Sequence, residues 1–180
     1  MEQGRVSAAA AGVLGYRGDY GDWQRQQVVD TLLAARQLTD LTLSAAVWGI
    51  YENSWGWSSV SEGNIAYYQD SRAFLSEGAL DANLPMVYWP VTATPGERLD
   101  FRTLVQDHVD HASGRHVYAG VSATNLSWSQ VAECIAVSKE VGAQGAVLFD
   151  YKAVRDNGWL DDLAAGPWAA PSVVPERTWR

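Results

Sequence analysis

The sequence contains little cysteine, little positive charge and no long apolar run. Cys134 is the only cysteine among 180 residues, so no disulfide can form within the chain. There are 13 lysines and arginines against 21 aspartates and glutamates, which gives a formal net charge of −8. This acidic balance argues against nucleic acid as a partner, because nucleic-acid phosphates would be repelled. No apolar run approaches the roughly 20 residues that span a bilayer, so no membrane span is predicted.

Several motifs that carry chemistry are missing as well. No spacing of histidine, cysteine and aspartate is typical of a metal site, and neither common type of phosphate-binding glycine loop occurs. Ser122 lacks the G-x-S-x-G context of a hydrolase nucleophile. The sequence therefore predicts no metal and no cofactor. His108, His111, His116 and Cys134 fall on helix faces or at a strand start, where we expect structural roles.

What the chain does contain is a fourfold alternation of apolar strands and helix-like stretches. The predicted strands cover residues 43–48, 84–88, 116–121 and 146–149. They recur at intervals close to the roughly 31 residues per unit of a (β/α)₈ barrel. The sequence therefore predicts an α/β fold of about four parallel strand–helix units, which together form a partial TIM barrel.

Amphipathic periodicity predicts a helix before or between these strands. Asp22 is expected to cap a first helix that runs to Gln37. Ser127 and Gln130 fit a capping box that opens the last helix. Beyond Asp156, glycine and proline predict irregular chain. The remaining predicted helices cover residues 64–77, with Ile65, Tyr68 and Leu75 facing inward, and residues 101–112.

Aromatic and polar residues gather where the predicted strands end, which is the edge at which parallel barrels carry their chemistry. Glu52 and Asp150 are the carboxylates there, and glycoside hydrolysis uses a pair of carboxylates. Both are therefore catalytic candidates. In the alternative interpretation, Glu52 binds substrate or backbone and Asp150 closes a structural hydrogen bond. Flat rings can stack on sugars, so the substrate-binding candidates are Tyr51, Asn53, Trp55, Trp57, Tyr88, Trp89 and Tyr151.

Four segments carry a family resemblance: LSAAVWGIYENS, YYQDSRAFLSEGALDANLPMVYW, GRHVYAGVSA and GAQGAVLFDY. With them, residues 23–168 resemble the bacterial glycosyl-hydrolase-like family ten, glycoside hydrolases with a (β/α)₈ catalytic barrel. The resemblance implies strands five to eight of that barrel, between a poorly defined segment 1–22 and a tail 169–180. It also implies a polysaccharide or oligosaccharide partner, no cofactor, and an extracellular or periplasmic location for the complete protein.

The chain departs from the family pattern before its first predicted helix. Family members carry a Gly-hydrophobic-His-hydrophobic-Asp motif on strand four, and residues 1–22 contain no such motif. We therefore expect a fragment of a glycoside hydrolase that acts on O-glycosidic bonds of a bacterial cell-wall or related polysaccharide. The isolated chain is expected to be inactive, because one acid is missing. The exposed edges of a half barrel also predict self-association.

Two alternatives remain open at the level of sequence. The first is a non-catalytic carbohydrate-binding or vestigial half barrel, which keeps the aromatic residues without the chemistry. The second is a barrel enzyme of another class, such as an aldolase or isomerase. That class needs a lysine or a phosphate site at a strand end, and the sequence shows neither, since Lys139 and Lys152 lie off the strand ends.

Overall fold

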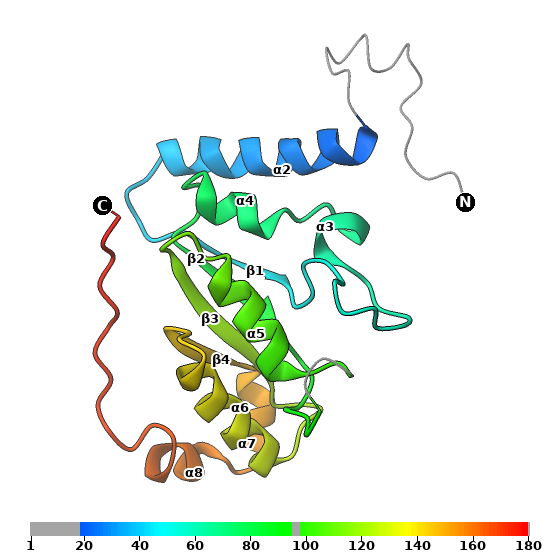
Figure 1. Cartoon of the computed structure of the whole chain (residues 1–180). Coiled ribbons are helices and arrows are strands. Elements are labelled where there is room, and N and C mark those ends of the chain that lie inside the picture. The colour runs from blue at the N-terminus through cyan, green and yellow to red at the C-terminus, as the bar shows by residue number, and fades with distance from the viewer. Residues whose placement is uncertain (1–18, 95–97, 180) are drawn as a thin grey trace.

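The computed structural model describes residues 19–94 and 98–179, and its centre is a four-stranded parallel sheet (Figure 1). The strands are adjacent in chain order, β1-β2-β3-β4, as the sequence predicts. Of the predicted segment 1–22, residues 1–18 lie outside the described part of the chain. The strands are β1 (Ser44–Trp48), β2 (Ala82–Met86), β3 (His116–Ser122) and β4 (Gly145–Phe149).

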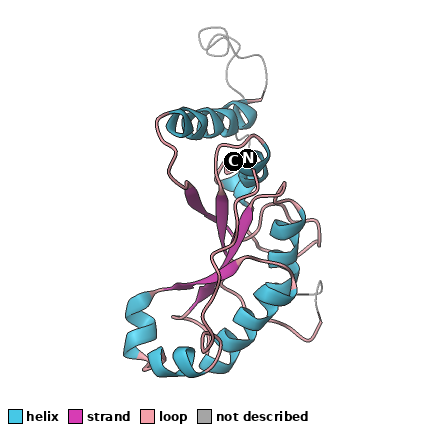
Figure 2. Cartoon of the chain, turned by 90° about the vertical axis from the view of Figure 1, so that its left-hand side faces the viewer, coloured by secondary structure: helices cyan, strands magenta, loops and turns pink. Residues whose placement is uncertain are grey.

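The helices are arrayed along one side of the sheet, and the other side carries no helix (Figure 2). None of them is long and apolar enough to cross a membrane within the described residues. Together the elements form an α/β unit of the barrel-like kind. The helices are α2 (Tyr20–Gln37), α3 (Gly63–Ala66), α4 (Ser71–Ser76), α5 (Phe101–Asp110), α6 (Trp128–Glu140), α7 (Tyr151–Asp156) and α8 (Leu160–Ala165).

Side chains alternate along each strand, and one set forms the core beneath the helices. Val47 packs with Val29 of α2 and Phe74 of α4, while Val121 packs with Phe101 of α5. The other set forms what we call the open face of the sheet. By alternation and register the open face consists of Ser44, Ala46, Trp48, Ala82, Leu84, Met86, His116, Tyr118, Gly120, Ser122, Gly145, Val147 and Phe149.

The capping residues explain where the long helices begin. The Ser127–Gln130 capping box opens α6 as predicted. The first helix begins earlier than predicted, because Asp19 rather than Asp22 is its N-cap and accepts a hydrogen bond from the Gly21 amide. The third predicted helix is confirmed in α5, whose N-cap Asp100 accepts from the Thr103 amide.

The predicted helix over 64–77 is wrong, because the chain there forms α3 and α4 with a break between them. Ile65 is exposed rather than inward, and Tyr68 adopts a positive φ of 54°. The break has a long-range cause: the Gln69 side chain accepts a hydrogen bond from the Trp48 amide at the end of β1. Asp70 then caps α4 by accepting from the Ala73 amide.

The bounds of one strand and the presence of one further helix also differ from the sequence prediction. Strand β2 starts two residues before the predicted 84–88 and ends at Met86, after which the Tyr88 amide donates to the Met86 carbonyl in a turn. Asn83 and Pro85 conceal this strand in the sequence, because both residues disfavour strands. The stretch beyond Asp156 also contains α8, although irregular chain is predicted there.

The tail crosses the amino-terminal ends of the strands (Figure 1). The Trp179 indole donates to Asp81, which directly precedes β2, at 2.9 Å. His116 at the start of β3 donates from Nε2 to the Glu176 carbonyl at 3.1 Å. Arg177 donates to the Thr42 hydroxyl at 2.9 Å. We call residues 167–179 the strap, because they tie together chain segments that begin different strands.

Replacing Gly120 by alanine is expected to lower the free energy of unfolding by about 1–3 kcal/mol, the range typical of overpacking. A Cβ at this position would lie 2.6 Å from the Pro85 carbonyl oxygen, a backbone atom of the neighbouring strand. The matched control is Gly145→Ala, whose Cβ would meet only the movable Tyr118 ring at 3.0 Å. Urea denaturation of both variants tests this, and equal losses would contradict the backbone argument.

Candidate functional site

The carboxyl ends of the four parallel strands lie at one edge of the sheet, which we call the carboxyl edge. Glu52 follows the end of β1, Tyr88 follows β2, and Asp150 follows β4 directly. The three residues therefore share one edge, where ligands gather in parallel α/β folds.

Two aromatic residues, Phe149 and Tyr151, flank Asp150 in the sequence at the carboxyl end of β4. Tyr88 stacks on Phe149 with ring centroids 5.6 Å apart and an interplanar angle of 24°. Phe149 is 52% exposed and Tyr151 is 68% exposed, so both present ring surface to solvent. Partial burial raises the pKa of the Tyr88 phenol, which therefore stays protonated at neutral pH. The cluster can offer stacking surface and a neutral hydroxyl to a sugar.

Asp150 has a structural task that leaves part of its carboxylate available. It is the N-cap of α7, and its Oδ1 accepts a hydrogen bond from the Ala153 amide at 2.8 Å. Within the described residues, the second oxygen makes no hydrogen bond. One oxygen therefore holds the helix, as the structural interpretation proposed, while the other can still accept from a ligand.

On the β1 side, Glu52 and Tyr51 differ sharply in their exposure to solvent and in their hydrogen bonds. Glu52 is exposed, and its carboxylate makes no hydrogen bond to any described residue. Tyr51 is buried, donates to Asp70 at 3.1 Å and lies under the Arg72 guanidinium at 4.1 Å. Burial, followed by the charge and hydrogen bond of Asp70, raises the Tyr51 pKa to about 12. Tyr51 is therefore engaged with α4 and its N-cap, and only Glu52 is presented to solvent.

The loop after Glu52 uses its polar groups internally. Asn53 donates to the Trp57 carbonyl at 2.7 Å and accepts from the Trp57 amide at 3.1 Å. Trp57 is buried in the core, and Trp55 stacks on it with centroids 4.6 Å apart. Trp55 also lines a cavity of about 370 Å³ against α5. These three residues therefore shape the loop and its contact with the helix layer.

Trp89 lies between the core and the surface. It is partly buried against the core cluster, and its carbonyl lies 4.0 Å from the Cys134 sulfur. Burial raises the Cys134 pKa to about 12, so this thiol is unreactive at neutral pH. The expectation that Cys134 belongs to the core is confirmed.

The structure adds ring surface that the sequence interpretation omitted. Phe149 joins the Tyr88 cluster, and Trp48 pairs with Tyr67 at 4.5 Å on the β1 side. The Trp48 indole donates to the Ser61 carbonyl at 2.6 Å, which fixes the ring at the carboxyl end of β1. Strand alternation could have identified Phe149, because it lies two residues beyond Val147 on the same face.

The two candidate carboxylates lie at the same carboxyl edge but follow the two outermost strands of the sheet. Glu52 follows β1 and Asp150 follows β4, so their strands lie three spacings apart, about 14 Å along the sheet. Glycoside hydrolysis uses carboxyl groups about 5–5.5 Å apart for retention or about 6.5–9.5 Å for inversion. Within a single chain, the anchoring strands are therefore too far apart for either arrangement unless side chains and loops converge.

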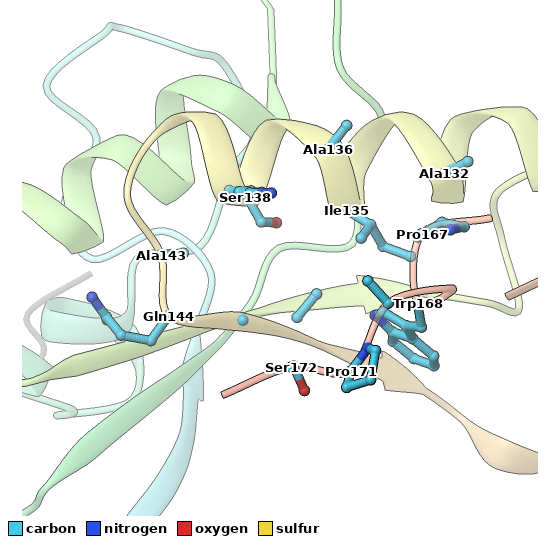
Figure 3. A pocket seen from close by; sticks show the side chains of 14 residues that line it. Ala132, Ile135, Ala136, Ser138, Ala143, Gln144, Pro167, Trp168, Pro171 and Ser172 are labelled. Carbon is cyan, nitrogen blue, oxygen red and sulfur yellow. The ribbon is translucent and has the colours of Figure 1, made fainter. Parts of the chain in front are cut away.

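A cavity of about 550 Å³ lies away from the carboxyl edge, between α6, the start of β4 and the strap (Figure 3). Trp168 and Pro171 of the strap face Ile135 of α6 across it. Gly145, at the amino-terminal end of β4, lines the same space. None of the proposed sugar-contacting residues lines this cavity.

Comparisons with known proteins add no assignment. No family model matches the chain, and no curated protein sequence matches it. Across residues 19–94 and 98–179, no group of three or more histidine, cysteine, aspartate or glutamate side chains is arranged to hold a metal ion.

Proposed function

We propose that this chain is one half of a TIM-type (β/α)₈ barrel of glycoside-hydrolase type, which binds polysaccharide or oligosaccharide at its carboxyl edge. In the closed barrel, Glu52 and Asp150 are the acidic residues that act on the O-glycosidic bond of a bacterial cell-wall or related polysaccharide. The exposed ring surfaces of Phe149 and Tyr151 bind the sugar, and Tyr88 supports the Phe149 ring by stacking on it.

One observation carries this proposal: a solvent-exposed aromatic cluster and a half-engaged carboxylate meet at the carboxyl edge of a sequential parallel sheet. Sequential strand order and helices on one side are the arrangement of a barrel segment. Stacked rings beside a carboxylate suit a sugar, since the rings contact its apolar face and the carboxylate accepts from its hydroxyls.

A non-catalytic carbohydrate-binding half barrel is the second candidate, and a specific observation favours it for a single open chain. Asp150 caps α7, and the strand that precedes Glu52 lies about 14 Å from β4. The aromatic cluster needs no such pairing to bind sugar. Hydrolysis therefore requires the closed barrel, whereas binding requires only the cluster.

Replacing Tyr151 by alanine is expected to weaken oligosaccharide binding about tenfold, which corresponds to about 1.4 kcal/mol of lost stacking. Tyr151 is 68% exposed, so its removal should leave the core intact. Calorimetric titration with soluble peptidoglycan fragments and chitooligosaccharides measures the dissociation constant.

The matched control is Trp168→Ala, which removes an exposed ring from the strap rather than from the carboxyl edge. This variant should bind as the unmodified chain does. Equal affinities of the unmodified chain, Tyr151→Ala and Trp168→Ala would contradict the proposed sugar site. Failure of the unmodified chain to bind any peptidoglycan fragment or chitooligosaccharide would contradict it as well.

A further inference from the structure

The cavity between α6, the start of β4 and the strap has the size and the lining of a small-molecule site (Figure 3). Its volume of about 550 Å³ falls within the roughly 300–1,000 Å³ of ligand pockets. Such pockets are mostly apolar and carry few polar groups. Alanines, prolines, Ile135 and Trp168 form most of the wall of this cavity, so its lining follows the same pattern.

Short side chains on α6 and stiff residues in the strap keep this space open. Ala132 and Ala136 lie about one helical turn apart on α6, and each fills the cavity with no more than a methyl group. Pro167 and Pro171 line the opposite side, and their rings restrict the backbone of the strap. The strap is therefore hindered from folding down onto the helix.

The strap is also fixed beyond both ends of the cavity. Next to α8, the Trp168 amide donates to the Leu163 carbonyl at 3.0 Å. At the far end, the Trp179 indole donates to Asp81 at 2.9 Å. A wall that is fixed before the ligand arrives lowers the entropy cost of binding.

The cavity is positively charged in an acidic protein. Of the described residues that line it, Lys139 in the last turn of α6 is the only charged one. The chain has two lysines, and the other, Lys152, forms an ion pair with Asp156. The Lys139 ammonium makes no ion pair and no hydrogen bond to any described residue. It can therefore pair with an anionic ligand, and no carboxylate of the lining opposes that ligand.

The neighbouring polar side chains are largely committed to the fold. The Gln144 side chain accepts a hydrogen bond from the Val117 amide at 2.7 Å. The Ser138 hydroxyl donates to the Cys134 carbonyl at 2.7 Å. The cavity therefore offers a ligand mainly apolar surface and the Lys139 ammonium.

The shape of the cavity suits a flat ring. Trp168 and Pro171 of the strap face Ile135 of α6 across it (Figure 3). Trp168 is 48% exposed, so part of its ring surface is free for contact. An aromatic ligand can stack on an indole and pack against aliphatic side chains on its other face.

We propose that this cavity binds a flat aromatic carboxylate, whose ring lies between Trp168 and Ile135 and whose carboxylate accepts a hydrogen bond from the Lys139 ammonium. Burial of the ring stabilises the complex, and the charge-assisted hydrogen bond selects the acid over its neutral analogues. None of the residues proposed to bind sugar lines the cavity. The inference therefore does not depend on the proposed sugar function.

The role of Lys139 is tested with two probes of the same shape, 2-naphthoate and the neutral 2-naphthamide. In calorimetric titration the unmodified chain should bind 2-naphthoate about tenfold more tightly, as expected for one charge-assisted hydrogen bond. Lys139→Gln changes an exposed side chain and should remove this preference. The matched control is Lys152→Gln, which removes the lysine outside the cavity and should keep it. Equal affinities in the unmodified chain, or a preference that persists in Lys139→Gln, would overturn the proposal.

The location is tested by filling the cavity. Ala136→Phe adds a ring on the α6 wall and should weaken binding of both probes by about tenfold or more, because the two rings would overlap. The control is Ala34→Phe, which changes an exposed alanine of α2 outside the lining and should bind both probes as the unmodified chain does. Unchanged binding in Ala136→Phe, or an equal loss in both variants, would contradict the location.

The ligand class is tested with octanoate, which carries the same carboxylate on a flexible chain. Octanoate should bind more weakly than 2-naphthoate, because it cannot stack on Trp168. Tighter binding of octanoate would indicate an acyl chain as the occupant and overturn the aromatic class. Failure of the unmodified chain to bind 2-naphthoate would overturn the site itself. Neither outcome affects the oligosaccharide titration of Tyr151→Ala, which reports on the carboxyl edge.

Discussion

Replacing Asp81 by alanine is expected to lower the free energy of unfolding by about 3–5 kcal/mol, the range for breaking one side of a buried ion pair. The Asp81 side chain is only 1% exposed. It accepts from Arg36 at 2.5 Å, from the Leu43 amide at 2.8 Å and from the Trp179 indole at 2.9 Å. Its loss leaves the Arg36 guanidinium largely buried with no carboxylate beside it. Urea denaturation followed by circular dichroism measures the change.

The same substitution should also release the strap. Trp179 lies 98 residues from Asp81 in the sequence, so this hydrogen bond is a direct link between the C-terminal segment and the strand layer. Limited proteolysis within residues 167–179 should become faster in Asp81→Ala. The control is Asp110→Ala, which also removes one negative charge but at an exposed helix end. Equal stability of the two variants, or unchanged proteolysis of the strap, would contradict the role assigned to Asp81.

Lowering the pH of the unmodified protein should reproduce part of this loss of folding stability. Burial alone would raise the Asp81 pKa, but the hydrogen bonds from Trp179, the Leu43 amide and Arg36 outweigh it and hold the pKa below its ordinary value. A carboxyl whose folded pKa is lowered stabilises the fold fully above the unfolded pKa of about 4. The contribution is lost as the pH falls below that value and through the folded pKa.

The strand layer was predictable because buried parallel strands are nearly continuous apolar runs. The segment around β3 and the segment around β4 were located to within one residue for this reason. The prediction for β2 was displaced by two residues because Asn83 and Pro85 disfavour strands in a sequence pattern. Asn83 is buried, and its side-chain amide donates to the Ser71 carbonyl at 2.7 Å, a contact that no local pattern reports.

The candidate site was predictable only as a set of strand ends. Parallel strands bring their carboxyl ends to one edge, which is enough to place Glu52, Tyr88 and Asp150 together at that edge. The direction of each side chain depends on tertiary contacts. Tyr51 turns toward the helix layer because Asp70 and Arg72 bind it there, and no local pattern in the sequence reports those contacts.

Acidification from pH 7 to pH 4 is expected to lower the free energy of unfolding by roughly 3 kcal/mol through His108 alone. His108 is buried on α5, and its Nε2 lies 3.2 Å from the Gly49 carbonyl, to which the neutral ring donates. Burial, the largest cause, lowers its pKa from 6.5 to about 4, although the Asp107 carboxylate raises it. Arg72 and His111 lower it further.

The sign follows from proton uptake on unfolding. Between pH 6.5 and about pH 4, His108 binds a proton in the unfolded chain but not in the folded protein, so its contribution is full above pH 6.5 and declines as the pH falls through this window. Below about pH 4 both states are protonated and the loss stops. Urea denaturation at a series of pH values should show this slope in the unmodified chain and in His111→Gln, which alters an exposed histidine. His108→Gln keeps a side-chain donor for Gly49 but has no proton to bind, so the slope should disappear; a slope that persists in this variant would assign the acid sensitivity to another group.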